Sequence, residues 1–153
     1  MKSCVECGNI LKLKKLSNGK IMCKPCIDSG NERDAEPEWS WHEANQILDK
    51  LFLGSETSAS DFTFISKNRI SNILIIGNNI EKYFESNPKI NYKQIGINDE
   101  PSEDILQYFD ECFWFIEEAL SNETFYEGNL LIHCVAGMSR SATITIAYMM
   151  RKY

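Results

Sequence analysis

The sequence predicts an α/β fold in which a central, mostly parallel sheet carries helices on both faces, preceded by a small N-terminal module. Between residues 45 and 153, short apolar runs typical of buried strands alternate with longer stretches of helical periodicity, which is the pattern of strand–helix–strand units. The 153 residues are 43% hydrophobic and 25% charged, a globular composition with enough chain for one domain and a small module beside it.

The distribution of charge divides the chain into two units. Residues 1–30 carry six lysines against two acidic residues, whereas residues 31–153 carry ten basic residues against twenty acidic ones. A reversal of sign of this size indicates two different surfaces. The polar, acidic stretch that ends at Pro37 has the character of a linker. We therefore expect a module at 1–30, a linker at 31–44 and a larger domain at 45–153.

Several classes of partner and location are disfavoured by the sequence. The acidic balance of the larger unit argues against a broad nucleic-acid surface. The longest apolar runs, such as the one at 73–76, are far shorter than the ~18 residues of a membrane span. The N-terminus leads into charged residues instead of the apolar core of a secretory signal. We expect no membrane association and a reducing compartment, the cytoplasm or the nucleus.

Four of the six cysteines have the spacing of a zinc site. They form two C-x2-C pairs separated by fifteen residues, namely Cys4, Cys7, Cys23 and Cys26. Two such turns can direct four sulfur ligands at one ion in tetrahedral geometry. Two disulfides or four free thiols are the alternatives, and disulfides are not expected without a secretion signal.

The residues between the two cysteine pairs have the pattern of a β-hairpin. Residues 10–16 and 20–22 flank Asn18-Gly19, a strong signal for a tight hairpin turn. The segment resembles a zinc ribbon. A unit of about thirty residues has almost no core, so zinc would supply its folding energy. Because protein thiolates fill all four positions, we expect a structural zinc that stabilises the module or a surface for a protein partner.

The first half of the larger domain is expected to contain two strands and two helices. In order, these are a strand at 47–53, a helix at 57–68 with a Thr or Ser cap, an entirely apolar and β-branched strand at 70–76, and a short helix at 80–86 ended by Pro88.

The second half continues the alternation. We expect a strand at 92–97, an amphipathic helix at 102–120, a strand buried on both faces at 130–133, and an apolar helix at 140–150. The apolar stripe of the first helix includes Cys112. We interpret Cys112 as a core residue, and a redox partner for a reactive cysteine is the alternative.

The segment that joins the last strand to the last helix combines groups that bind a phosphate and attack it. Its residues are His133, Cys134, Val135, Ala136, Gly137, Met138, Ser139, Arg140 and Ser141. Backbone N–H groups of such a loop and the N-terminus of the following helix form an anion cradle. Arg140 can grip phosphate oxygens with its planar guanidinium, and the same field would lower the pKa of the Cys134 thiol. The segment therefore predicts a phosphate site that holds an ionised nucleophile.

This segment, HCVAGMSRSAT, resembles the His-Cys-x5-Arg-Ser signature of the cysteine-based protein phosphatases, and in particular the loop of the dual-specificity protein phosphatases. LFLGS at 51–55 is similar to an early strand of that family, and Ile-Asn-Asp at 97–99 to the position of its general acid. The helices at 113–119 and 142–150 also match. The resemblance covers about residues 45–153 and implies a cysteine-phosphatase-like fold.

The resemblance implies roles for the residues of the loop. Cys134 is expected to attack phosphorus and form a cysteinyl-phosphate, while Arg140 and the backbone N–H groups of residues 135–140 hold the phosphate oxygens. Ser141 is expected to hydrogen-bond the departing thiolate. His133 is expected to orient the loop and support the thiolate without shuttling a proton. No metal or organic cofactor is implied for catalysis.

The general acid is expected at Asp99. It would protonate the leaving oxygen and later accept a proton from the attacking water. Asp104 is the other candidate, but it falls in the first turn of a predicted helix, where Asp has a capping reason to be.

The function expected from this resemblance is hydrolysis of phosphotyrosine and phosphoserine or phosphothreonine in phosphorylated proteins. One alternative is a phosphatase for RNA 5′ ends, lipids or sugars, although the lack of Lys at 135–139 argues against inositides. Another is a phosphate-binding pseudophosphatase or adaptor that recruits partners through the zinc module. The given sequence stops thirteen residues after Arg140, where family members usually continue with about two more helices.

Overall fold

The structure, a computed structural model, describes residues 13–15, 21–23, 44–121 and 126–153. The chain divides into two compact units, Met1–Ser40 and Trp41–Tyr153, which are treated separately below. None of the helices in the described residues has the length and apolar character required to cross a membrane.

The described part of the N-terminal unit is a two-stranded antiparallel hairpin. Strand β1 (Leu13–Lys15) pairs with β2 (Ile21–Cys23), with Leu13 opposite Cys23. The strands agree with the predicted hairpin. The predicted turn and three of the predicted zinc ligands lie outside the described residues, as does the side chain of the fourth, so zinc ligation stays a prediction. These ligands are Cys4, Cys7 and Cys26, with Cys23 as the fourth.

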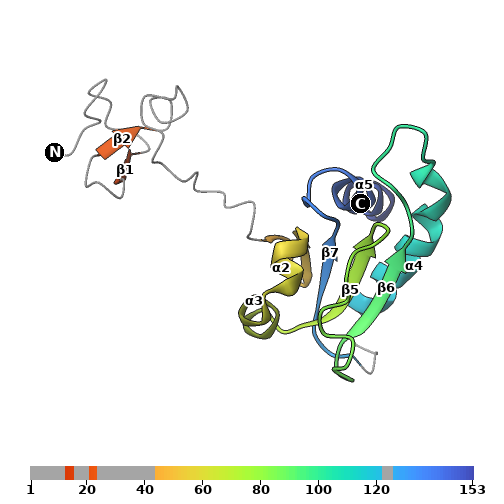
Figure 1. The fold of residues 1–153 in the computed structure, drawn as a ribbon, viewed down its shortest axis with the longest axis horizontal. Coiled ribbons are helices and arrows are strands. Elements are labelled where there is room, and N and C mark those ends of the chain that lie inside the picture. Colours follow the sequence, from red (N-terminus) through yellow and green to blue (C-terminus); the bar gives the residue numbers. More distant parts are fainter. Residues whose placement is uncertain (1–12, 16–20, 24–43, 122–125) are drawn as a thin grey trace. The chain divides into compact units, whose positions relative to one another are not determined.

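The larger unit is built on a five-stranded mixed sheet, part of which can be followed in Figure 1. Its strands are β3 (Asn45–Leu48), β4 (Leu51–Gly54), β5 (Ile70–Ile76), β6 (Asn91–Ile95) and β7 (Asn129–His133). They lie in the order β3-β4-β7-β5-β6. Strand β3 is antiparallel to β4, whereas the other neighbouring pairs are parallel. The predicted mostly parallel sheet is confirmed.

Helices cover both faces of this sheet, as predicted (Figure 1). Helices α4 (Phe109–Leu120) and α5 (Arg140–Lys152) pack on one face, and α2 (Glu56–Ser60) and α3 (Phe62–Lys67) on the other. Every residue of β5 is buried. Its side chains alternate between the two cores: Leu74 and Ile76 face the first, and Ile73 and Ile75 the second. A strand buried on both faces is apolar at nearly every position, which explains the unbroken run in the sequence.

The single strand predicted at 47–53 is wrong, because β3 and β4 form a hairpin there. The chain turns at Asp49 and Lys50, and the Gln46 side-chain amide donates to the carbonyl of Asp49 at 2.8 Å. Two consecutive polar residues mark this turn between apolar runs.

The single helix predicted at 57–68 is also wrong, because it is divided at Asp61. The backbone of Asp61 is extended, and its Oδ1 accepts a hydrogen bond from the backbone N–H of Thr63 at 2.8 Å. Asp61 therefore ends α2 and caps α3, a use for which a short polar side chain is suited.

Two further helix predictions need correction. Residues 83–86 form turns in place of the helix expected at 80–86, with the backbone N–H of Phe84 donating to the Tyr92 hydroxyl at 3.1 Å. The helix expected from residue 102 begins later, as a 3₁₀ turn (Ile105–Tyr108) that leads into α4. Asp104 caps this turn, since its Oδ1 accepts from the backbone N–H of Leu106 at 3.1 Å.

The parallel strands bring four loops to one edge of the sheet. The chain leaves β4 at Gly54, β5 at Ile76, β6 at Ile95 and β7 at His133, all at the carboxyl end of the strand. In open α/β sheets this edge is where ligands bind. The residues of the predicted phosphate site, Asp99 and 133–141, all lie in two of these loops or directly beside them.

Candidate active site

The loop of residues 134–139 joins strand β7, which is buried from Leu130 to His133, to a helix. His133, the last residue of β7, is completely buried, and α5 begins at Arg140 with Ser139 as its N-cap. The carbonyl of Ser139 accepts from the backbone N–H and the hydroxyl of Thr143, at 2.8 and 3.0 Å. Both ends of the loop are thus fixed by regular structure.

Gly137 allows this loop to fold against the end of β4. Its φ is +77°, in the left-handed region that favours glycine. A Cβ at this position would lie 2.6 Å from the carbonyl oxygen of Gly54. Close by, the backbone N–H of Glu56 donates to the carbonyl of Val135 at 3.0 Å. No side chain would fit at 137 without moving the loop.

The Cys134 thiol lies at the base of this loop and is 1% exposed. Its Sγ accepts hydrogen bonds from the backbone N–H of Gly137 and from the hydroxyl of buried Ser141, each at 3.2 Å. Burial opposes ionisation of the thiol. The hydrogen bonds from Ser141 and Gly137, together with the charge of Arg140, outweigh burial and lower the pKa of Cys134 below its ordinary value.

His133 is neutral at physiological pH because burial lowers its pKa to about 4. Its Nδ1 lies 3.2 Å from the carbonyl oxygen of Cys134. A carbonyl can only accept, so the neutral ring carries its proton on Nδ1. The other nitrogen, Nε2, is buried, and no described residue hydrogen-bonds to it. In this state the ring holds the backbone of the neighbouring cysteine and has no proton on Nε2 to give.

Arg140 and Asp99 meet although they are far apart in the sequence. Arg140 Nη1 donates to the carbonyl of Ile97 at 3.2 Å, and its Nε lies 3.6 Å from Asp99 Oδ2, within ion-pair range. The hydroxyl of Ser139 donates to Asp99 Oδ1 at 2.9 Å. The Asp99 side chain is 53% exposed, so its carboxyl group stands between the loop and solvent.

The rim of the loop is open and uncharged. Val135 and Met138 are 51% and 56% exposed, and Ala136 is exposed between them. The structure therefore combines a cation, a thiol of lowered pKa, a carboxyl group and an accessible apolar rim. This set of groups can bind a phosphate ester, attack it and protonate its leaving oxygen.

Sequence reasoning missed the part played by Gly77, directly after β5. A Cβ at Gly77 would lie 2.7 Å from Arg140 Nη1, so glycine leaves room for the guanidinium. It also did not predict that the carbonyl of Ile97 accepts a hydrogen bond from Arg140. The position of Gly77 at the carboxyl end of a predicted parallel strand was the available signal.

Cys112 differs from Cys134 in its surroundings. It is 1% exposed in the core between the sheet and α4. Burial, reinforced by the charge of Glu111, raises its pKa to about 12. These surroundings agree with a core residue and do not favour a reactive thiol.

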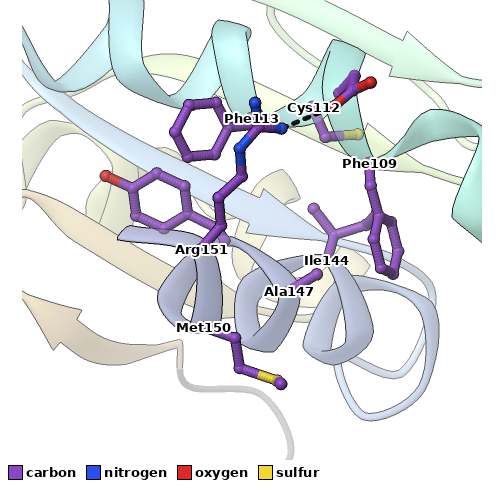
Figure 2. A pocket seen from close by; sticks show the side chains of 9 residues that line it. Phe109, Cys112, Phe113, Ile144, Ala147, Met150 and Arg151 are labelled. Atoms are coloured by element: carbon purple, nitrogen blue, oxygen red, sulfur yellow. Dashed lines mark hydrogen bonds and ion pairs between the residues drawn. The ribbon is translucent and has the colours of Figure 1, made fainter. Parts of the chain in front are cut away.

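A groove of about 360 Å³ lies elsewhere, between α4 and α5; Cys112 lines it, whereas Asp99 and residues 133–141 do not. In Figure 2, the side chain of Arg151 crosses this groove above the Phe113 ring and is paired with Asp110. Ile144, Ala147 and Met150 form its other wall.

Replacement of Ser141 by Ala should raise the pKa of Cys134, because it removes a donor to the sulfur. A hydrogen bond to a charged group contributes about 1.5–3 kcal/mol. Each ~1.4 kcal/mol is a factor of ten in the ionisation equilibrium, so the midpoint of the pH dependence of Cys134 alkylation by iodoacetamide should move upward by about one to two pH units. Peptide mass spectrometry would follow Cys134 and Cys112 separately. Cys112 serves as the internal control, and an unchanged pH dependence at Cys134 would contradict this account.

Comparison with known proteins places this site in a family. The model of the dual specificity phosphatase catalytic domain matches residues 51–153. Dual specificity protein phosphatase 9 of Homo sapiens is 41% identical over 107 residues, which are 70% of this chain and 27% of that protein. Dual specificity protein phosphatase 7 of Homo sapiens is 38% identical over 126 residues, 81% of this chain and 29% of that protein. The chain thus spans less than a third of the length of either relative.

Solved structures agree with these relatives. The crystal structure of the human tyrosine phosphatase-like serine/threonine/tyrosine-interacting protein superposes with a TM-score of 0.64 at 34% identity, over 72% of this chain and 74% of that one. The Yvh1 phosphatase domain from Chaetomium thermophilum gives a TM-score of 0.64 at 32% identity, over 72% and 68% of the two chains. Since the family match includes the parallel strands, the Cys134 loop and α5, this chain belongs to the dual specificity phosphatase catalytic domain family.

Proposed function

We propose that this chain hydrolyses phosphotyrosine and phosphoserine or phosphothreonine in proteins through a cysteinyl-phosphate intermediate. The observation that carries the proposal is the environment of Cys134. Its sulfur accepts from Gly137 and Ser141, and its pKa is lowered inside a loop that ends at Arg140. The names of the matched relatives support the same activity.

In the first step, the Cys134 thiolate attacks phosphorus, a P–S bond forms and the P–O bond to the leaving group breaks. Arg140 and the backbone N–H groups of residues 135–140 hold the remaining phosphoryl oxygens, where the charge of the transition state is concentrated. Asp99 gives its proton to the leaving oxygen. The Arg140 guanidinium near the Asp99 carboxyl supports this assignment, because it brings the acid close to the phosphate site.

In the second step, water attacks phosphorus and the P–S bond breaks. The Asp99 carboxylate accepts the proton of the water, and inorganic phosphate leaves. Ser141 donates to the departing sulfur, as its 3.2 Å contact in the free protein supports. Neutral His133 supports the loop through the Cys134 carbonyl.

The loop favours a monophosphate on a protein side chain over a polyanionic ligand. Arg140 is the one cationic residue in the segment 134–141. Exposed Val135 and Met138 can pack against the apolar atoms of a peptide or the ring of phosphotyrosine. Phosphorylated proteins are therefore the substrates that we propose. The compartment that we propose is the cytoplasm or the nucleus.

Cys134→Ser should abolish turnover of both phosphotyrosyl and phosphothreonyl peptides, with a loss of at least about 10³-fold, because the nucleophile is removed. The measurement is phosphate release from each peptide, beside a small aryl phosphate. Cys112→Ala is the matched control and should remain active. A folded wild-type chain that binds vanadate without turnover would indicate a phosphate-binding adaptor instead. Turnover of RNA, lipid or sugar phosphates alone would contradict the substrate class.

Asp99→Ala should lower turnover of a phosphopeptide by roughly 10²–10⁴-fold, which is the contribution of a positioned general acid. Asp104→Ala should lose about 1 kcal/mol of stability with its cap but keep its turnover. Steady-state kinetics with both variants, beside thermal unfolding, separate the two effects. If Asp104→Ala were the slower enzyme, the acid would have been assigned to the wrong carboxyl group.

For the N-terminal unit we propose a structural zinc held by Cys4, Cys7, Cys23 and Cys26 in a module that spans residues 1–30, followed by a linker at 31–44 and the catalytic domain at 45–153. The antiparallel pairing of β1 with β2 supports the proposal, because the chain reverses direction between the two cysteine pairs. When bound, the ion would supply folding energy to a unit with almost no core. A surface of this module is our candidate for contact with a protein partner.

Atomic absorption should detect about one zinc per chain after purification in zinc-containing buffer, and the Cys4→Ser and Cys7→Ser variants should each lose it. Cys112→Ala is the control that should keep the metal. Metal-free wild-type protein with four freely titrating N-terminal thiols would rule the site out.

A further inference from the structure

We propose that Ser139 is a positioning residue for Asp99, and that its hydroxyl determines which oxygen of the Asp99 carboxyl group carries the transferred proton. The inference rests on the proposed function, in which Asp99 is the general acid. The sequence predicts a phosphate contact for the backbone N–H of Ser139 and no role for its side chain.

The contact that motivates the proposal joins two loops that are forty residues apart. Ser139 Oγ donates to Asp99 Oδ1 at 2.9 Å. Asp99 is more than half exposed, and an exposed carboxyl group without an anchor samples several rotamers. Ser139 has the firmer position, because its carbonyl accepts two hydrogen bonds from Thr143 in the first turn of α5.

The two residues before Asp99 are held by contacts that do not involve Ser139. Asn78 Nδ2 donates to Asn98 Oδ1 at 3.0 Å, and Asn98 Nδ2 donates to Glu103 Oε1 at 2.9 Å. Arg140 Nη1 adds a bond to the carbonyl of Ile97. What these contacts leave open is the direction of the Asp99 side chain.

The two oxygens of Asp99 have different neighbours. Oδ1 accepts from Ser139, whereas Oδ2 lies 3.6 Å from Arg140 Nε. Arg140 Nε is buried and has no hydrogen-bond partner among the residues that the structure describes. The Arg140 guanidinium is also the group that would bind the phosphoryl oxygens, so Oδ2 faces the side on which the leaving oxygen must lie.

A protonated carboxyl group has one O–H and one carbonyl oxygen. The oxygen that accepts a hydrogen bond from a hydroxyl is favoured as the carbonyl oxygen. When the Arg140 guanidinium is engaged by phosphoryl oxygens, a Ser139 hydroxyl that donates to Oδ1 favours the proton on Oδ2, the oxygen directed toward the phosphoryl group. Without this contact the carboxyl group can rotate, and a smaller fraction of molecules holds the proton in a position to transfer.

The effect should depend on the leaving group. Phenol has an ordinary pKa near ~10, as the tyrosine side chain has, and its anion leaves slowly unless it is protonated. The p-nitrophenolate anion is stabilised by its nitro group and needs the acid much less. Loss of a residue that positions the acid should thus slow phenyl phosphate hydrolysis more than p-nitrophenyl phosphate hydrolysis.

The experiment compares kcat/KM for these two substrates in the full chain and its Ser139→Ala, Ser139→Thr and Ser60→Ala variants. Ser139→Ala should lose about tenfold with phenyl phosphate and less than about threefold with p-nitrophenyl phosphate, since only part of the acid contribution of ~10²–10⁴ depends on position. Ser139→Thr keeps the hydroxyl and should recover most of the loss. Ser60→Ala makes the same change at an exposed serine whose hydroxyl donates to the carbonyl of Thr57, and both rates should be unchanged. Alkylation of Cys134 should keep its pH dependence in Ser139→Ala.

A double-mutant cycle with Asp99→Ala completes the test. If Ser139 acts through Asp99, Ser139→Ala should cause no further loss in the Asp99→Ala background. An equal loss with both substrates, or the same loss with and without Asp99, would overturn the proposal and assign Ser139 to the structure of the loop. If Asp99→Ala alone shows no dependence on the leaving group, the general acid has been misassigned and the inference fails with it. Hydrolysis that still requires Cys134 would then leave the rest of the proposed function standing.

Discussion

The close approach of the loop of residues 134–139 to the end of β4 is the contact on which the site depends. Strands β4 and β7 are parallel neighbours, with Gly54 in register with His133. The loop after β7 folds back over Gly54, and only glycine at 137 permits that approach. The same turn brings the Gly137 N–H within 3.2 Å of Cys134 Sγ. A steric constraint between the ends of two strands thus places a hydrogen-bond donor, the Gly137 N–H, at the Cys134 thiol.

Two buried cysteines in one domain show that burial alone does not make a reactive thiol. Cys112 and Cys134 are each 1% exposed. Burial raises the pKa of Cys112 to about 12, with Glu111 adding to the effect. At Cys134, donors from Ser141 and Gly137 and the charge of Arg140 reverse the effect of burial. The difference lies in donors that point at the sulfur, which is the general condition for stabilising a buried anion.

Local signals in the sequence predicted the elements that form the centre of the domain. Strand β5, strand β7 and helix α5 were predicted because their apolar patterns are long and unbroken. The errors lie where one or two polar residues redirect the chain, as at Asp49 in the β3–β4 turn and at Asp61 between α2 and α3. Asp and other short polar residues also occur on the exposed faces of helices. The sequence alone therefore does not show which of them end a helix or form a turn.

The resemblance to a known family, and no local pattern, placed Asp99 in the site, because its contact with the loop of residues 134–139 depends on strand order. Strand β5 lies between β7 and β6, so the loop after β6 and the loop after β7 can meet only across the end of β5. The chain turns away there at Gly77, and Arg140 crosses the opening to reach the carbonyl of Ile97. A side chain at 77 would occupy the path of the guanidinium. Close packing at the end of the central strand therefore controls whether Asp99 can reach the loop that carries Cys134, although neither residue belongs to that strand.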